Sequence, residues 1–384
     1  MRIGLLVPEL PPDTIGGGGA VFRALAEQLA ARGHEVRVVT SHTHGGPWPD
    51  RAETRFEVLR LREVPQPAPA YRTYMPPYPW ELLRAHALLD GCDVVNAHGH
   101  GHPLVDLLTT LSVPSTRTVY SLHGFLYSIP KRGGVIARAY GAYDDVLGKR
   151  ALRRSRRVTA VSSAVASEAA RRGRPDTIVI NNGFEPFERT PALPERIVSE
   201  MRKGPYLLGI GRLEELKGFD IALEALRALR KLGIPLRLLV AGRDNGSLAT
   251  LRALAERLDI AESVSFTGFV QHAQLPALYR EAFAYTLTSR TEAFPAAPLE
   301  AMSLRAPCVL ARVGGVTDIA TDDESALLFE SEDSAGMAAA VSRLWHDPAL
   351  VTRLTVVGVA VSARFAWPAI AAAYEAVLSS VGHA

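Results

Sequence analysis

Short apolar runs alternate with longer amphipathic segments along almost the whole chain. The apolar runs predict buried strands in two series, at residues 3–7, 36–40, 94–97, 118–122, 158–161 and 177–180, and then at 206–210, 236–241, 264–266, 284–287, 308–311 and 326–329. Segments between them, such as 20–32, carry apolar residues at helical spacing. Strands of this kind alternating with helices predict parallel sheets covered on both faces, and two series predict two doubly wound α/β domains.

A proline-rich stretch separates the two series. Residues 182–205 hold Pro186, Pro191, Pro194 and Pro205, which predicts a domain boundary there. We expect an N-terminal domain over residues 1–185 and a C-terminal domain over residues 186–364. The last segment, 368–381, has the pattern of an amphipathic helix with no strand after it.

Two regions interrupt this alternation. Residues 45–80 are rich in proline and aromatic residues, and residues 124–134 form a long loop after a strand end. Ligands of open α/β sheets bind outside the carboxyl ends of the strands, so both regions are candidate substrate loops. For residues 45–80, a segment that merely covers the sheet edge is an equally good interpretation.

Composition narrows the class of protein. The chain has 384 residues, 47% of them hydrophobic, and a net charge of +3, so neither a disordered protein nor an obligate nucleic-acid partner is indicated. No apolar run approaches the length of a membrane span, and the first residues lack the pattern of a signal peptide. The two cysteines, Cys92 and Cys308, define no disulfide framework. We therefore expect a cytoplasmic protein.

A glycine run precedes the first predicted helix. Residues 16–19 are all glycine, and glycines at a helix N-terminus let backbone N–H groups approach an anion. The spacing differs from the G-x-G-x-x-G pattern of dinucleotide sites, which disfavours a dehydrogenase. A flexible turn is the alternative.

Two cations follow the first strand of the second series. Arg212 comes at the strand end and Lys217 at the start of the next helix, so both can reach one pocket and bind a diphosphate. The alternative is a pair of surface cations bound to Glu214 or Glu215.

Two carboxylates lie eight positions apart further along. Glu292 is predicted in a loop and Glu300 near the start of a helix, where both could accept hydrogen bonds from sugar hydroxyls. Stabilisation of the helix dipole is the alternative role for Glu300.

Histidines mark two strand ends in the first half. His123 follows the predicted strand 118–122, and a lone histidine of this kind is more often structural than catalytic. The alternating run of His98, His100 and His102 suggests a zinc site, but no acidic or cysteine ligand pattern accompanies it. We expect no metal.

Taken in order, these motifs resemble the retaining glycosyltransferases of family 4, which have the GT-B fold of two Rossmann-like domains with the site in the cleft between them. The likeness covers nearly the whole chain. Its other elements are Pro11-Pro12, residues 25–29 and 32–36, Val161-Ser162, Asn182-Gly183, Gly218, residues 240–242 and 266–270, Tyr279, residues 300–302, Gly314-Gly315 and residues 365–367.

The resemblance implies a role for each candidate residue. Arg212 and Lys217 would bind the donor diphosphate, Glu292 would hold the donor-sugar hydroxyls with His123 on the opposite wall, and Glu300 would bind the ribose. Further donor contacts would come from Gly17, Gly18, Gly242, Phe269, Val270, Phe294, Pro295, Ala296 and Ala297. Residues 365–384 would form a helix that crosses back onto the N-terminal domain, which carries the acceptor side.

Three departures from the family pattern bear on the donor. Ala293 and Pro295 stand where the family usually has glycines, and Arg305 stands where it usually has glycine after the Glu-Ala-Met helix. Phe184-Glu185 replaces the more usual Val-Asp. None of these changes removes a proposed catalytic group.

The implied function is a retaining, metal-independent transfer of a hexose from a nucleotide-diphosphate sugar to an unidentified hydroxyl acceptor, with no cofactor besides that co-substrate. The alternatives are another GT-B enzyme such as a phosphorylase, and a non-catalytic subunit that binds nucleotide sugars. The basic run at residues 149–157 could give weak peripheral contact with anionic lipid, or form only a solvated helix face.

Overall fold

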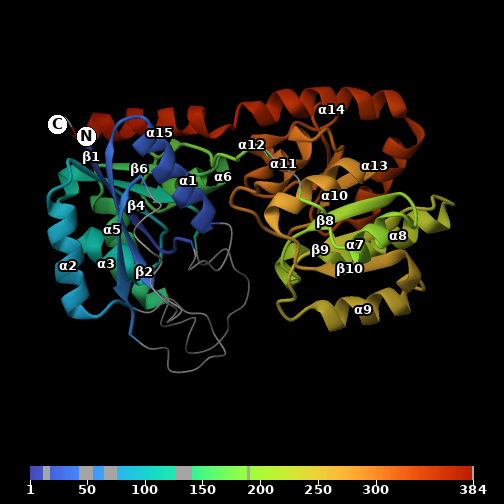
Figure 1. Cartoon of the computed structure of the whole chain (residues 1–384), viewed down its shortest axis with the longest axis horizontal. Helices are drawn as coiled ribbons and strands as arrows, with labels where there is room; N and C mark the ends of the chain where they lie inside the picture. The colour runs from blue at the N-terminus through green and yellow to red at the C-terminus, as the bar shows by residue number, and fades with distance from the viewer. Residues whose placement is uncertain (12–17, 43–54, 65–75, 126–140, 188–190, 383–384) are drawn as a thin grey trace. The chain divides into compact units, whose positions relative to one another are not determined.

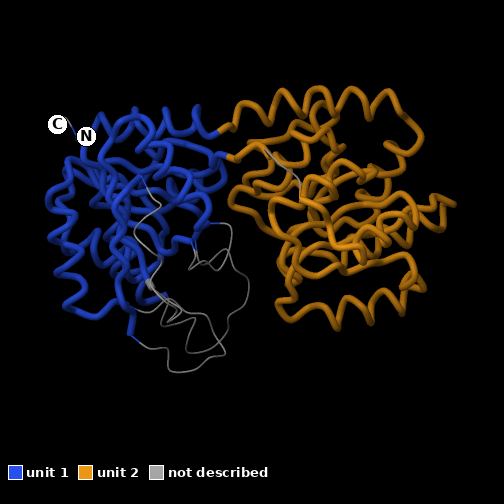
Figure 2. Tube along the Cα trace, in the orientation of Figure 1, with its two compact units in different colours: residues 1–183, 367–384 blue, residues 184–366 orange. Residues whose placement is uncertain are grey.

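The computed structural model describes residues 1–11, 18–42, 55–64, 76–125, 141–187 and 191–382, which belong to two compact units (Figures 1 and 2). Unit 1 comprises Met1–Gly183 with Trp367–Ala384, and unit 2 comprises Phe184–Ala366. The chain therefore passes between the units twice. Both passages lie two residues from the predicted domain limits, and the last helix belongs to the same unit as the N-terminal half.

The described strands of unit 1 form one parallel sheet in the order β3-β2-β1-β4-β5-β6-β7. These strands are β1 (Arg2–Val7), β2 (Glu35–His42), β3 (Glu57–Arg62), β4 (Val94–His98), β5 (Thr118–Leu122), β6 (Arg157–Ala160) and β7 (Ile178–Val179). The helices are α1 (Gly18–Ala31), α2 (Pro79–Asp90), α3 (Pro103–Leu111), α5 (Lys149–Arg154), α6 (Ser163–Arg171) and α15 (Trp367–Gly382), with a 3-10 turn η2 (Ser115–Arg117) and a π-helical turn η4 (Asp144–Gly148).

Helices cover both faces of this sheet. Ile3 and Leu5 point to one face, where they share a core with Leu25 of α1 and Leu378 of α15. Gly4 points to the other face, where it lies against Leu89 of α2. Alternate residues of β1 are thus buried under different helices, which explains its continuous apolar sequence.

The described strands of unit 2 form a second parallel sheet in the order β10-β9-β8-β11-β12-β13. They are β8 (Tyr206–Ile210), β9 (Arg237–Ala241), β10 (Val264–Gly268), β11 (Ala284–Leu287), β12 (Cys308–Ala311) and β13 (Leu327–Phe329). The helices are α7 (Glu195–Met201), α8 (Phe219–Lys231), α9 (Leu248–Arg257), α10 (Leu275–Glu281), α11 (Ala297–Ser303), α12 (Val316–Ile319), α13 (Ser334–His346) and α14 (Pro348–Ala363), with 3-10 turns η5 (Glu215–Lys217), η6 (Ala261–Ser263) and η7 (His272–Gln274).

The prediction of a substrate loop over residues 45–80 is wrong where the structure has a strand and the start of a helix. Residues Glu57–Arg62 form β3, an edge strand paired in parallel with β2, and α2 begins at Pro79. The strand was missed because Glu57, Arg60 and Arg62 interrupt its apolar pattern. Arg60 is nevertheless buried, because its guanidinium donates hydrogen bonds to the carbonyl oxygens of Leu10 and Pro11.

Each sheet has one point at which the strand order reverses direction. In unit 1 this point lies between β1 and β4, and in unit 2 it lies between β8 and β11. Parallel α/β sheets bind ligands at the carboxyl ends of the strands that flank such a point. A ligand site is therefore expected among the residues that follow Val7, His98, Ile210 and Leu287. None of the described helices is long and apolar enough to cross a membrane.

Candidate functional site

Three contacts join the loops that follow β8 and β11 in unit 2. The Lys217 ammonium donates to Oε1 of Glu292 at 2.6 Å, the Thr288 hydroxyl donates to the Lys217 carbonyl at 2.9 Å, and the backbone N–H of Arg290 donates to the Leu216 carbonyl at 2.8 Å. These loops leave the two strands that flank the reversal point. A cation and a carboxylate that are 75 positions apart in sequence therefore form an ion pair where a ligand is expected.

The Glu292 carboxylate has a second fixed partner. The Ser289 hydroxyl donates to the same oxygen, Oε1, at 2.7 Å. The side chains of Lys217 and Glu292 are 24% and 13% exposed, so both are largely withdrawn from water but still accessible. With Oε1 engaged twice, Oε2 of Glu292 is the oxygen available to accept hydrogen bonds from a ligand.

Arg212 has a different environment. Its guanidinium pairs with Glu214 at 2.9 Å and is 49% exposed. The alternative interpretation, in which both cations pair with Glu214 or Glu215, is correct for Arg212. It is wrong for Lys217, which pairs with Glu292. An exposed ion pair of this kind is weak, so the guanidinium can be redirected to an anionic ligand at little cost.

Two glycines allow the backbone segments of this site to approach each other closely. A Cβ atom on Gly242 would lie 1.7 Å from the Gly211 carbonyl oxygen, and a Cβ atom on Gly314 would lie 1.7 Å from that of Glu292. Gly314 also has a φ of 46°, and the next residue, Gly315, donates its N–H to the Glu292 carbonyl at 3.1 Å. Gly242 therefore supports the loop of Arg212, and the Gly314-Gly315 turn supports Glu292.

Glu300 lies in the first turn of α11 and is held at both of its oxygens. Oε1 lies 3.0 Å from Nε2 of His272, and Oε2 accepts from the Tyr279 hydroxyl at 2.9 Å. Burial raises the pKa of the Tyr279 phenol well above its ordinary value, so the hydroxyl remains a donor. Contacts with His272 and Tyr279 therefore hold the Glu300 carboxylate in place, so its role is not limited to stabilising the helix dipole. His272 carries no sequence motif of its own and was not among the predicted site residues.

The segment between the two carboxylates contains the remaining predicted donor residues of this loop. Phe294 and Pro295 are buried, with the Phe294 ring 5.7 Å from that of Phe365, while Ala296 and Ala297 are partly exposed. Within the described residues, the backbone N–H groups of Phe294, Ala296 and Ala297 have no hydrogen-bond partner. These amides can therefore donate to a ligand, although Ala293 and Pro295 replace the usual glycines.

Arg305 occupies a position with glycine-like geometry. Its φ is 61°, in the left-handed region. Glycine, which is usual at this position in the family, readily takes this conformation. Here Arg305 takes it although it has a side chain. Arg305 therefore adopts a left-handed backbone conformation that glycine would adopt at less steric cost.

Phe269 and Val270, which follow β10, differ in exposure. The Phe269 side chain is 61% exposed, and the Arg243 guanidinium lies 5.4 Å from the centre of its ring. Val270 is 7% exposed. Phe269 therefore exposes aromatic surface beside Arg243, whereas Val270 could meet a ligand only through its backbone.

In unit 1, the loop after β1 meets the first turn of α1. Glu9 is buried and accepts a hydrogen bond from the backbone N–H of Gly19 at 3.0 Å. A Cβ atom on Gly18 would lie 3.0 Å from the same carboxylate oxygen. Glu9 thus already occupies one N–H donor at the start of α1, a contact that the glycine run does not predict. Gly17 lies outside the described residues.

His123 forms a pair with His98 at the ends of β5 and β4. Nε2 of His123 lies 2.9 Å from Nδ1 of His98, and the Phe22 ring packs against both imidazoles. Burial lowers the pKa of His123 to about 4 and that of His98 well below its ordinary value, so both rings are neutral at neutral pH. The sequence gives no signal for this pair, because it depends on the pairing of β4 with β5.

The histidine run 98–102 is divided among separate environments. His100 lies 2.5 Å from Oδ1 of Asp144, which in turn accepts from Arg172 at 2.9 Å through Oδ2. His98 points instead to His123. The described residues contain no group of three or more histidine, cysteine or acidic side chains that could hold a metal ion.

The two halves of the chain match two glycosyltransferase families. Residues 15–186 match the family described as Glycosyltransferase Family 4, and residues 195–356 match the family described as Glycosyl transferases group 1. The D-inositol 3-phosphate glycosyltransferase of Acidothermus cellulolyticus is 30% identical over 392 residues, which cover 94% of this chain and 84% of that protein. The glycogen synthase of Mycobacterium tuberculosis is 29% identical over 376 residues, covering 92% and 88%.

Solved structures share the fold over nearly the full length. Sucrose-phosphate synthase from Thermosynechococcus elongatus has a TM-score of 0.75 and 22% identity, covering 99% of this chain and 98% of that one. Anabaena HepE in complex with UDP and glucose has a TM-score of 0.75 and 20% identity, covering 99% and 100%. The expected fold of two Rossmann-like domains of the GT-B type is confirmed.

The contact between His272 and Glu300 predicts a measurable titration. The hydrogen bond to the Glu300 carboxylate raises the pKa of His272 above its ordinary value of 6.5. We expect the His272 imidazole to titrate above pH 6.5 in an NMR titration, and the Glu300→Gln variant to move its midpoint to lower pH. The matched control is Glu262→Gln, which removes an exposed carboxylate of the same unit and should leave the midpoint unchanged. An unchanged midpoint in Glu300→Gln would show that this contact is absent in solution.

Proposed function

We propose a specific reaction for this chain, which belongs to the glycosyl transferases group 1 family and is a hexosyltransferase. The chain transfers a hexose from a nucleotide-diphosphate sugar to a hydroxyl acceptor, with retention of anomeric configuration and without a metal ion. The observation that carries the proposal is the pair of cations, Arg212 and Lys217, on the loop at the reversal point of the unit 2 sheet.

Several similar proteins support a nucleotide sugar as the donor. The Anabaena HepE protein has been solved in complex with UDP-glucose, and another structural neighbour, from E. coli, with UDP-2-fluoro glucose. In this chain, the exposed Phe269 ring offers a surface on which a base can stack, and Glu300 can accept hydrogen bonds from ribose hydroxyls. We infer that unit 2 binds the donor, with UDP-glucose as the first compound to test.

The cations account for how the donor bond can be broken. Breaking the bond between the anomeric carbon and its oxygen leaves negative charge on the departing diphosphate. Lys217 and Arg212 stabilise that charge, and they do so most strongly in the transition state, where the charge develops. Glu292 holds Lys217 in place before the donor arrives and accepts hydrogen bonds from the sugar through its second oxygen.

Retention follows if the acceptor attacks from the face that the diphosphate leaves. The bond from the anomeric carbon to the diphosphate oxygen breaks, the bond to the acceptor oxygen forms on the same face, and the acceptor proton passes to the departing diphosphate. This route requires no carboxylate nucleophile. His123 of unit 1 is proposed to act on the transferred sugar in the same reaction.

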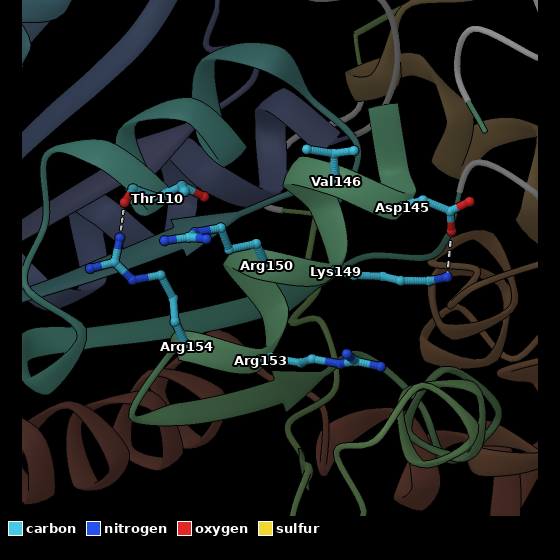
Figure 3. Close-up of a pocket in the computed structure, with 7 residues that line it drawn as sticks. All are labelled: Thr110, Asp145, Val146, Lys149, Arg150, Arg153 and Arg154. Carbon is cyan, nitrogen blue, oxygen red and sulfur yellow. Dashed lines mark hydrogen bonds and ion pairs between the residues drawn. The ribbon is translucent and has the colours of Figure 1, made fainter. Parts of the chain in front are cut away.

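A basic surface on unit 1 is proposed to make weak peripheral contact with anionic lipid. A cavity of about 610 Å³ lies beside α5. Its lining includes Lys149, Arg150, Arg153 and Arg154, whose side chains are drawn in Figure 3. Lys149 pairs with Asp145, and Arg154 donates to the Thr110 carbonyl. Arg150 and Arg153 are exposed and have no ion pair with any described residue, and the neighbouring Val146 is 66% exposed. Free cations beside an exposed apolar side chain suit an anionic membrane surface.

A cytoplasmic location belongs to the same proposal. It is supported by the two cysteines, which are buried, unpaired and located in different units.

The cations make the reaction testable by substitution. Lys217→Ala should lower kcat more than it raises the KM for the donor, with a loss of roughly 10²-fold or more in kcat/KM. Arg212→Lys should also be costly, because an ammonium cannot reproduce a two-pronged guanidinium contact. Initial rates with UDP-, GDP-, ADP- and dTDP-glucose, with water as acceptor where no other is known, provide the measurement. The control is Lys231→Ala, an exposed lysine at the end of α8. Near-normal kcat in folded Lys217→Ala protein would remove the basis of the mechanism, and binding without turnover in the native chain would favour a non-catalytic subunit.

Metal independence predicts that chelation has no effect. Because the side chains of Arg212 and Lys217 supply the positive charge at the diphosphate in this proposal, protein treated with EDTA should keep its full rate. The same initial-rate assay, run with and without added Mn²⁺ or Mg²⁺, measures this. Loss of activity in EDTA with recovery on adding Mn²⁺ would contradict the proposal.

The basic surface predicts binding to anionic vesicles only. The chain should sediment with phosphatidylglycerol-containing vesicles and not with pure phosphatidylcholine, and salt should weaken the binding. Replacing Arg150 and Arg153 together by glutamine should reduce it, because each basic residue contributes about 1 kcal/mol near such a surface. The matched control replaces the exposed Arg252 and Arg257 of α9. Equal vesicle binding by the two double variants would show that Arg150 and Arg153 form only a solvated helix face.

A further inference from the structure

We propose that His98 fixes the tautomer of His123, with the proton on Nδ1, so that His123 acts on the substrate as a hydrogen-bond donor and never as a base. The inference rests on the proposed function in assigning His123 to the reaction, but the tautomer itself can be observed without any activity. His98 would then be a positioning residue of the site.

The geometry reduces the pair to two arrangements. Nδ1 of His98 and Nε2 of His123 are 2.9 Å apart, which is a hydrogen-bond distance. Both imidazoles are neutral at neutral pH, so each carries one N–H, and only one of the two facing nitrogens can be the donor. Either His98 donates to His123, or His123 donates to His98.

The far side of the His98 ring decides between them. Nε2 of His98 is buried and has no hydrogen-bond partner among the described residues. If His123 were the donor, the proton of His98 would have to lie on this nitrogen, as a buried N–H without an acceptor. If His98 is the donor, the same nitrogen is a bare lone pair. Buried N–H groups without acceptors are the rarer of the two in proteins, which favours His98 as the donor.

The surroundings hold the His98 ring in this orientation. The Phe22 ring lies 5.3 Å from it and the Tyr374 ring of α15 lies 5.9 Å away. Tyr374 is itself fixed by hydrogen bonds with Ser121 and Thr159, and the hydroxyls of those two residues are 2.7 Å apart. The last helix of the chain therefore packs behind the pair.

The consequence concerns the other nitrogen of His123. With Nε2 accepting from His98, the single proton of His123 lies on Nδ1, which has no partner among the described residues. A ring in this state can donate to a sugar oxygen, but it has no free lone pair with which to remove a proton from the acceptor. The acceptor proton then has to go elsewhere, which agrees with its transfer to the departing diphosphate.

The test reads the tautomer directly. In protein labelled with ¹⁵N-histidine at neutral pH, two-bond ¹H–¹⁵N correlation should show His123 protonated at Nδ1 and unprotonated at Nε2, with signals assigned from the His98→Asn and His123→Asn variants. Detection of His123 with its proton on Nε2 in the native chain would overturn the proposal. The tautomer is read in the native chain, and the two variants serve only to assign its signals.

Two substitutions of His98 supply the functional half of the test. In His98→Asn, the amide nitrogen of the new side chain can take the place of Nδ1 and donate, so this variant should keep the tautomer of His123 and most of kcat for UDP-glucose hydrolysis. His98→Leu removes the donor, so His123 should populate both tautomers. We expect kcat to fall by roughly 10-fold or more with little change in KM. Equal kcat in the two variants would overturn the positioning role. Full activity in His123→Ala, with the predicted tautomer observed in the native chain, would instead reject the role of His123 in the proposed function.

Discussion

The candidate donor site depends on how the loops after β8 and β11 are joined. Strand β8 pairs with β11 in parallel, and therefore both loops leave the sheet at the same edge. The ion pair between Lys217 and Glu292, supported by Ser289 and by the contact of Thr288 with the Lys217 carbonyl, then links them across that edge. Removing one member would leave the other partly buried without its counter-charge, which is unfavourable. The same contact thus holds a cation and a carboxylate together at the carboxyl edge of the sheet, where the proposed donor would bind.

The close backbone approaches in this site are part of that constraint. Gly242 lies against the carbonyl of Gly211, and Gly314 lies against the carbonyl of Glu292, so no side chain could be accommodated at either position. Both contacts support the loops that carry the ion pair. Unit 1 contains a feature of another kind, a pair of histidines in contact at 2.9 Å whose pKa values are lowered by burial.

Much of the fold could be predicted because buried parallel strands have continuous apolar sequences. The strands Thr118–Leu122, Tyr206–Ile210, Ala284–Leu287 and Cys308–Ala311 were predicted to the residue. The edge strand β3 could not be predicted in this way. Its Arg60 is buried only because its guanidinium donates to carbonyl oxygens in the loop after β1. An edge strand has one neighbour fewer, so its sequence is less constrained to be apolar.

The sequence indicated which residue types to expect in the candidate site, but not which side chains contact one another. The spacing of Arg212 and Lys217 pointed to a diphosphate, but the partner of Lys217 lies 75 residues away and is brought near only by the pairing of β8 with β11. In the same way, His98 and His123 meet because His98 lies opposite Ser121 in the register of β4 and β5, two residues before His123. Sequence spacing carries no information on such contacts, which arise from strand register.

A double-mutant cycle on Lys217 and Glu292 tests the central claim most directly. It compares kcat/KM in Lys217→Ala, Glu292→Ala and the double variant, with the nucleotide sugar that supports turnover. If the ion pair acts as one unit on the transition state, the double variant should lose about as much as the more damaged single variant, because groups that act together are strongly non-additive. Losses that add to within about 0.5 kcal/mol would mean that the two residues act independently, and would contradict the account.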